Sequence, residues 1–139
     1  MPRAVLDAGV LIAAIIKPNG VCGRLLRACL DGQYTLVASP QLLGELEVVL
    51  LRSKFRPYLS EQEAVEYADS IRGIAEIHRD IPVHGVFTPD PKDDYLVALA
   101  RDANAHYLIS GDPHLTGLID PEPPVLTPRA FLEKLINDR

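Results

Sequence analysis

Four acidic residues, widely separated along the chain, are the strongest candidates for chemistry: Asp7, Glu45, Asp93 and Asp112. Carboxylates without nearby histidine or cysteine suit a hard cation such as Mg²⁺ or Mn²⁺. A cation held by them could polarise a phosphate group and lower the pKa of a bound water. Asp90 and Asp94 are neighbours that could take the place of Asp93 in such a set.

Each acid also has a purely structural interpretation. Aspartate is a preferred helix N-cap, and Asp7, Asp93 and Asp112 all precede expected helices or turns. Glu45, taken alone, is typical of a solvated helix residue. Capping explains any one of these acids better than it explains four that meet at one place, so the elements that position them decide between the two interpretations.

Short apolar segments that alternate with helical patterns predict those elements. Strands are expected at 5–6, 34–38, 74–78, 106–110 and, weakly, 123–126. Helices are expected at 10–16, 21–30, 40–52, 60–72, 93–103 and after Thr127-Pro128, with 81–91 irregular. This alternation predicts an α/β fold with a mostly parallel sheet of four to five strands, covered on both faces as a three-layer α/β/α sandwich.

The expected sheet would bring the four acids to one edge. Ligands of parallel sheets bind beyond the carboxyl ends of the strands. Asp7 and Asp112 each follow a strand, and Asp93 begins the helix that leads into the 106–110 strand. Glu45 lies in the first turns of the helix after the 34–38 strand. We therefore expect a metal site at this edge.

Composition is typical of one globular domain, 1–139. Apolar residues make up 47% of the 139 residues, enough for a core. The longest apolar run, Ala8–Ile16, is too short to span a bilayer, and an acid precedes it, so we expect a cytoplasmic protein without membrane contact. Cys22 and Cys29 would lie roughly 10.5 Å apart along one helix, too far for a disulfide. Two cysteines without nearby histidines also make a poor zinc site.

The charge balance gives a mixed indication about nucleic acid. A net charge of −5 is unusual for a non-specific nucleic-acid binder, which normally carries a basic stripe. Metal binding would neutralise part of a clustered acidic charge. Ten arginines against four lysines leave guanidinium groups for phosphate contacts.

Four segments resemble the motifs of the PIN domain family. They are VLDAGVLI at 5–12, SPQLLGEL at 39–46, DPKDDYLVALA at 90–100 and YLISGDPHL at 107–115. Their order and spacing match across nearly the whole chain, and the chain is similar to the VapC-like toxin components of toxin–antitoxin pairs. One departure is Ala8-Gly9, where the family usually has Thr-Asn, so polar side chains that could support the site are missing.

The resemblance implies a metal-dependent endoribonuclease, in which a metal-activated water attacks phosphorus in line and leaves a 5′-phosphate. It implies that Asp7, Glu45, Asp93 and Asp112 are catalytic metal ligands for Mg²⁺ or Mn²⁺, with the apolar residues 96–100 favouring Asp93 over Asp94. Ser39 and Ser110 would orient a ligand or a water from behind. Expected partners are the RNA substrate, an antitoxin that inserts a basic residue near the acids, and a second copy in a homodimer.

Two alternatives stay open at this point. A PIN fold could bind RNA or protein without cutting, although such a protein would be free to lose its acidic set. The same metal chemistry could also serve a structure-specific DNA nuclease. The four histidines, His78, His84, His106 and His114, lack the spacing of a metal site or a catalytic triad. A haloacid-dehalogenase-type phosphotransferase is excluded because Gly9 stands where that chemistry needs a second aspartate.

Overall fold

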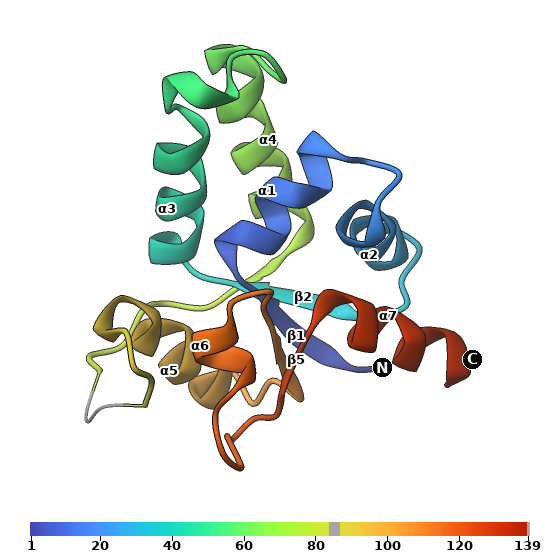
Figure 1. Ribbon diagram of the computed structural model, residues 1–139, viewed down its shortest axis with the longest axis vertical. Coiled ribbons are helices and arrows are strands. Elements are labelled where there is room, and N and C mark those ends of the chain that lie inside the picture. Colours follow the sequence, from blue (N-terminus) through green and yellow to red (C-terminus); the bar gives the residue numbers. More distant parts are fainter. Residues whose placement is uncertain (84–86, 139) are drawn as a thin grey trace.

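A five-stranded parallel sheet forms the centre of the computed structural model, which describes residues 1–83 and 87–138 (Figure 1). The strands lie in the order β3-β2-β1-β4-β5. They are β1 (Arg3–Leu6), β2 (Thr35–Ala38), β3 (Glu76–Ile77), β4 (Tyr107–Ile109) and β5 (Val125–Leu126). The chain runs outward in one direction from β1 to β3 and then returns to β4 on the other side of β1. The boundary between β1 and β4 is therefore the point at which ligands of such sheets bind.

Helices cover both faces of this sheet, which confirms the predicted α/β/α sandwich (Figure 1). On one side lie α1 (Ala8–Ile16), α2 (Val21–Leu30) and α7 (Pro128–Asn137), while α5 (Asp94–Asp102) and α6 (Pro113–Thr116) lie on the other. The pair α3 (Pro40–Leu50) and α4 (Glu61–Ile74) projects beyond the sheet. Two 3-10 turns complete the described elements, η1 (Ser53–Phe55) and η2 (Pro91–Asp93).

The core is built from the strands and from the apolar stripes of the helices. The last three residues of β1 and of β2 are fully buried, as expected for strands covered on both faces. The leucine stripe of α3 is also buried, so its leucines serve packing and leave no apolar groove on that face. In α5 every residue from Asp94 to Ala100 is buried, which anchors this helix firmly beneath β1 and β4.

Several element boundaries differ from the expected ones for local reasons. The first helix begins at Ala8 rather than at residue 10, because the Asp7 side chain accepts a hydrogen bond from the Val10 N–H and caps it there. Helix α4 continues to Ile74, so the expected 74–78 strand shrinks to β3, which pairs only with Val37 and Ala38. The short helix α6 was not expected. Of the expected irregular segment 81–91, residues 84–86 lie outside the described residues, and η2 already begins at its last residue.

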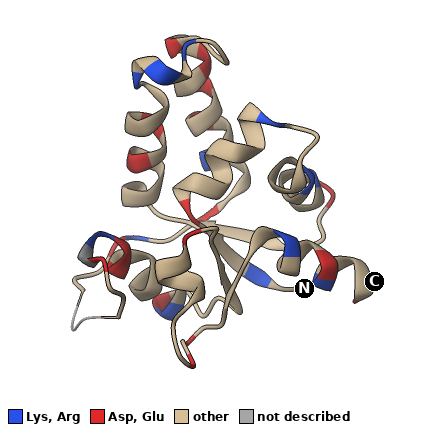
Figure 2. Cartoon of the chain, viewed as in Figure 1, with Lys and Arg blue, Asp and Glu red and all other residues tan. Residues whose placement is uncertain are grey.

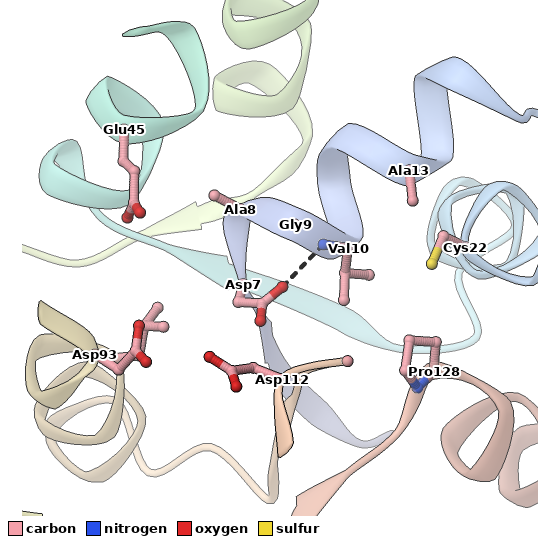
Figure 3. A pocket seen from close by; sticks show the side chains of 12 residues that line it. Asp7, Ala8, Gly9, Val10, Ala13, Cys22, Glu45, Asp93, Asp112 and Pro128 are labelled. Atoms are coloured by element: carbon pink, nitrogen blue, oxygen red, sulfur yellow. Dashed lines mark hydrogen bonds between the residues drawn. The ribbon is translucent and has the colours of Figure 1, made fainter. Parts of the chain in front are cut away.

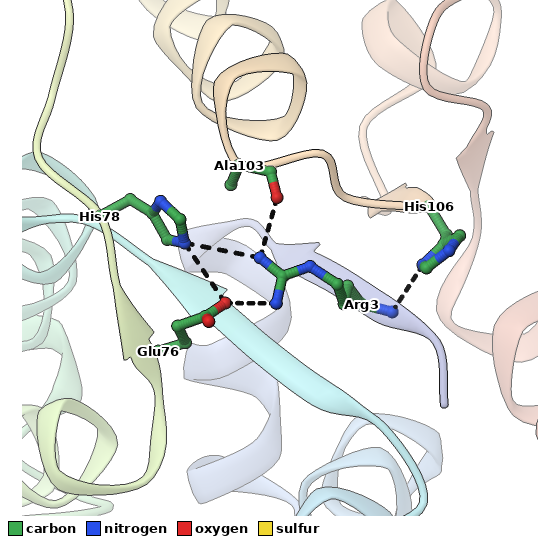
Figure 4. A network of polar contacts seen from close by, with 5 residues as sticks. All are labelled: Arg3, Glu76, His78, Ala103 and His106. Atoms are coloured by element: carbon green, nitrogen blue, oxygen red, sulfur yellow. Dashed lines mark hydrogen bonds and ion pairs between the residues drawn. The ribbon is translucent and has the colours of Figure 1, made fainter.

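A polar cluster holds the amino end of β1 (Figure 4). The Arg3 guanidinium forms a 2.5 Å ion pair with Glu76 of β3 and donates a 2.8 Å hydrogen bond to the Ala103 carbonyl at the end of α5. The Arg3 backbone N–H donates to Nδ1 of His106 at 3.0 Å. A hydrogen bond to His78 and the charge of Arg3 lower the pKa of Glu76. The cluster ties three elements together at the end of the sheet opposite to the acids.

Both cysteines are free and half-buried. Within the described residues, no single helix is long and apolar enough to cross a membrane, and α1 with α2 meets the length and composition criteria only as a pair bent by 98°.

Two glycines in helices test how tightly the fold is packed. A Cβ atom on Gly23 would lie 2.0 Å from the Pro18 carbonyl oxygen, whereas one on Gly44 would meet nothing within 4 Å. We expect Gly23→Ala to lower the free energy of unfolding by about 1–3 kcal/mol because the backbone must move apart. Gly44→Ala should raise it by about 0.5–1 kcal/mol through helix propensity. Urea unfolding followed by circular dichroism measures both, and a stable Gly23→Ala variant would contradict the close approach of α2 to Pro18.

Candidate active site

A pocket of about 460 Å³ opens at the boundary between β1 and β4 (Figure 3). The four acids singled out from the sequence all line it: Asp7, Glu45, Asp93 and Asp112. They come from four separate elements, namely the end of β1, the helix α3, the start of α5 and the start of α6. The structure thus brings together side chains that lie more than a hundred residues apart in the sequence, such as Asp7 and Asp112.

Asp7 and Asp112 are fixed by their own backbones and by the helices that they cap. The Asp7 N–H donates a 3.0 Å hydrogen bond to the Ile109 carbonyl, which aligns the end of β1 with the end of β4. The Asp7 carboxylate accepts from the Val10 N–H at 2.8 Å, and that of Asp112 accepts from the His114 N–H at 2.9 Å. Both residues therefore cap a helix and line the pocket at the same time.

Ser110 connects these two aspartates. It is fully buried, and its hydroxyl oxygen accepts a 2.9 Å hydrogen bond from the Asp112 N–H. Burial raises the pKa of Asp7, while hydrogen bonding to the Ser110 hydroxyl and to the Val10 N–H works in the opposite direction. Ser110 thus lies behind the two carboxylates.

Asp93 differs from the other two aspartates because it caps nothing. Its side chain makes no capping hydrogen bond to α5, and its Oδ2 atom is buried with no hydrogen-bond partner among the described residues. Burial, followed by the negative charges of Asp112, Asp90, Asp7 and Glu45, raises the pKa of Asp93 to about 6. A buried carboxyl oxygen without a partner costs free energy, and here no structural role accounts for it.

The neighbouring acids serve the local backbone instead. The Asp94 carboxylate is buried and accepts hydrogen bonds from the N–H groups of Phe87 and Thr88, at 3.2 and 2.9 Å. Asp90 accepts from the Lys92 N–H at 3.0 Å. Neither acid lines the pocket. Of the three acids left open by the sequence, Asp93 is the one that faces the pocket.

Glu45 is held by a residue that the sequence did not single out. The Tyr95 hydroxyl donates a hydrogen bond to Oε2 of Glu45, from α5 across to α3. Burial and then the interaction with Glu45 raise the pKa of Tyr95, so the hydroxyl keeps its proton. The sequence did offer one sign of this contact, because a tyrosine stands two residues after Asp93, next to the aliphatic stretch 96–100.

Ser39 lies away from the pocket. Its hydroxyl accepts a 3.3 Å hydrogen bond from the Leu42 N–H and caps α3, the helix that carries Glu45. Any effect of Ser39 on the pocket would pass through the position of this helix.

The chemistry of the lining groups fits a hydrated hard cation. All four acids offer carboxylate oxygens, which Mg²⁺ and Mn²⁺ prefer. In residues 1–83 and 87–138, no three acidic, histidine or cysteine side chains are close enough to hold one ion directly. Four like charges repel one another, and Mg²⁺ usually keeps several of its waters, so water would bridge part of the separation. The unpartnered oxygen of Asp93 is the first candidate for such a contact.

The raised pKa of Asp93 leads to a stability prediction for the metal-free protein. Because the pKa of Asp93 is about 6, against 3.8 for an ordinary aspartate, the folded state binds more protons than the unfolded chain between these values. The free energy of unfolding should then fall as pH rises from about 4 to 6. Asp93→Asn removes this loss. The free energy of unfolding of the variant should therefore exceed that of the wild type by about 1 kcal/mol at pH 7. The difference is no larger because Asp93 is partly exposed to solvent.

Urea unfolding in EDTA at pH 4 and pH 7 measures this difference. We expect equal stabilities at pH 4 and a more stable variant at pH 7. A variant that is no more stable than the wild type at pH 7 would show that the charge of Asp93 carries no cost in the folded protein.

Comparisons with known proteins agree with this architecture. Residues 3–114 match the family model described as a PIN domain. The uncharacterised protein MJ1680 of Methanocaldococcus jannaschii is 27% identical over 142 residues, which cover 95% of this chain and 90% of that protein.

Two solved structures share the fold. PAE2754 from Pyrobaculum aerophilum superposes with a TM-score of 0.66 at 12% identity, over 98% of this chain and 90% of that one. VapBC2 from Rickettsia felis, solved with a DNA fragment from its promoter, superposes with a TM-score of 0.65 at 15% identity, over 90% and 98%. PIN domains are generally nucleases that use divalent metals. Since the family match spans most of the chain, this protein belongs to the PIN domain family, with a fold of the nuclease type.

Proposed function

We propose that this protein is a metal-dependent endoribonuclease whose site is formed by Asp7, Glu45, Asp93 and Asp112. The observation that supports it most directly is the buried, unpartnered carboxyl oxygen of Asp93 in a pocket shared with three other acids. Hydrogen bonding within the described residues leaves this oxygen unexplained, whereas a cation would satisfy it. Membership of the PIN domain family adds to this support.

Each residue of the site would have its own part in the reaction. Asp7 and Asp112 are held in fixed orientations by the helices that they cap, with Ser110 between them. Tyr95 orients Glu45 from the opposite side. A bound Mg²⁺ or Mn²⁺ would polarise the scissile phosphate and lower the pKa of a water. By holding the cation, the fixed carboxylates would set where the phosphodiester lies. Attack of the water on phosphorus would break the P–O3′ bond, so that the 3′ oxygen leaves as a hydroxyl and the phosphate stays on the 5′ oxygen.

The proposal includes a role as the toxin of a toxin–antitoxin pair in the cytoplasm. The fold shared with VapBC2 of Rickettsia felis supports it. Large apolar side chains are exposed on the projecting pair of helices and the turn between them: Val48, Leu51, Tyr58 and Val65. An antitoxin or a second copy of the chain would cover such a surface, and the antitoxin would place a basic residue among the acids.

Cleavage of RNA tests the main proposal. Purified protein, freed of any co-purifying partner, is incubated with mixed-sequence RNA and Mg²⁺ or Mn²⁺, alongside Asp93→Asn and a matched Asp102→Asn variant. Asp102 is exposed at the far end of the same helix. We expect cleavage by the wild type and by Asp102→Asn, and a loss of about 100-fold or more in EDTA and in Asp93→Asn, because an interaction made in the transition state is removed.

Cleavage that persists in Asp93→Asn would point to a contaminating ribonuclease or a different site. Protein that neither cuts RNA nor binds metal in calorimetry would exclude the nuclease and favour a PIN fold that only binds RNA or protein. Metal binding with cleavage of a structured DNA, but of no RNA, would favour a DNA nuclease.

The contact between Tyr95 and Glu45 gives a second test. Tyr95→Phe removes only the hydroxyl that orients Glu45, so we expect about 10-fold weaker Mn²⁺ binding, as is usual when a group behind a ligand is lost. Calorimetry measures the affinity, with Tyr58→Phe as the control because Tyr58 is exposed and distant from the pocket lining. Unchanged Mn²⁺ affinity in Tyr95→Phe would exclude Glu45 from the metal site.

A further inference from the structure

The pocket has a second half that the acids leave unused. Beside Asp7 and Asp112, on the side away from Glu45 and Asp93, its wall is formed by Val10 and Ala13 of α1, Cys22 of α2 and Pro128 at the start of α7 (Figure 3). Burial and the nearby charge of Asp7 raise the pKa of the Cys22 thiol, so it stays neutral. This wall offers no charged side chain. A hydrated ion needs only the acidic half, and the whole volume of about 460 Å³ falls in the range of small-molecule pockets.

One cationic side chain follows the apolar wall directly in the chain. Arg129 of α7 comes next after the wall residue Pro128, whereas Arg24 of α2 lines a separate hollow with Arg27 and Leu132. Both are exposed, and neither forms an ion pair within the described part of the chain. Figure 2 shows basic positions on α2 and α7, to one side of the point where acidic positions from separate elements meet. The two helices that supply the apolar wall thus also carry positive charge.

We propose that the apolar half of the pocket is a nucleobase subsite. In it, a base of the substrate strand packs against Ala13, Cys22 and Pro128, its own phosphate faces the acids, and the next phosphate reaches Arg129. The position of the phosphate at the acids rests on the proposed nuclease function, whereas the affinity for a base does not.

The order of charges along the pocket supports this occupant. A nucleotide presents a flat apolar face beside an anionic phosphate. This matches an apolar wall with the cation-binding acidic half on one side and the exposed guanidinium of Arg129 next to Pro128. A wall without hydrogen-bonding side chains contacts the face of a base and leaves its edge unread. Purines and pyrimidines should therefore both bind, with little discrimination among bases.

Ala13 gives the sharpest test because its side chain lines the apolar half and touches none of the acids' helix caps. Calorimetry in Mn²⁺ compares adenosine 5′-monophosphate with ribose 5-phosphate, which lacks only the base. We expect the wild type to bind the nucleotide at least 10-fold more tightly than the sugar phosphate. Ala13→Leu, which fills the space, should abolish this preference and leave Mn²⁺ and ribose 5-phosphate affinities unchanged.

Two further variants keep the test decisive. Val83→Leu enlarges an exposed side chain outside the pocket lining and should keep the full preference. Cys22→Ser changes the polarity of the wall at nearly constant size, so it should weaken nucleotide binding several-fold without affecting ribose 5-phosphate, even if Ala13→Leu fails to fold.

The outcomes separate this proposal from the nuclease function. Metal-dependent RNA cleavage by a wild type that binds nucleotide and sugar phosphate equally would overturn the subsite and leave the nuclease intact. A preference for the nucleotide that survives Ala13→Leu and Cys22→Ser would also overturn it. A preference that those variants remove, in a protein that neither cuts RNA nor binds Mn²⁺ in calorimetry, would support the subsite and reject the nuclease.

Discussion

Burial of neighbouring carboxylates at one end of the sheet is the constraint around which this molecule is organised. Burial and like charge raise the pKa of Asp93 to about 6, and burial raises that of Asp7. The fold offsets part of this cost by position. Asp7 and Asp93 lie at the starts of α1 and α5, where the partial positive charge of a helix N-terminus favours an anion. The remainder is what a divalent cation would neutralise.

Rigidity away from the pocket makes this arrangement possible. The hydrogen bond from Asp7 to Ile109 fixes β1 against β4, and the buried strands leave the sheet little freedom to relax. At the opposite end of β1, Arg3 joins β3 to the end of α5, the helix whose start carries Asp93. Carboxylates that repel one another would otherwise move apart, so packing and the Arg3 cluster keep the pocket in shape from a distance.

Much of this was predictable from the sequence because it depends on local patterns. Alternating apolar strands and helices predicted the parallel sheet, and the rule for its carboxyl edge placed the four acids together. The hydrogen bond between Tyr95 and Glu45 could not be found that way, since it joins residues fifty positions apart and follows no periodicity. The short length of β3 was missed for a similar reason. Its length is set by its single neighbour β2 and by where α4 ends, whereas its own residues suggested a longer strand.

Asp7 and Asp112 each cap a helix and also line the pocket, and this affects how the sequences of related chains should be interpreted. Loss of an aspartate N-cap typically destabilises a protein by about 1 kcal/mol, so selection for folding alone would preserve both residues in a relative that had lost all catalysis. Asp93 has no such protection, because its charge destabilises the metal-free fold and its oxygen has no partner. Across an evolutionary lineage, Asp93 should therefore be the first of the three aspartates to drift once activity is no longer selected. An aspartate retained at position 93 therefore distinguishes an active enzyme from an inactive relative better than one retained at position 7.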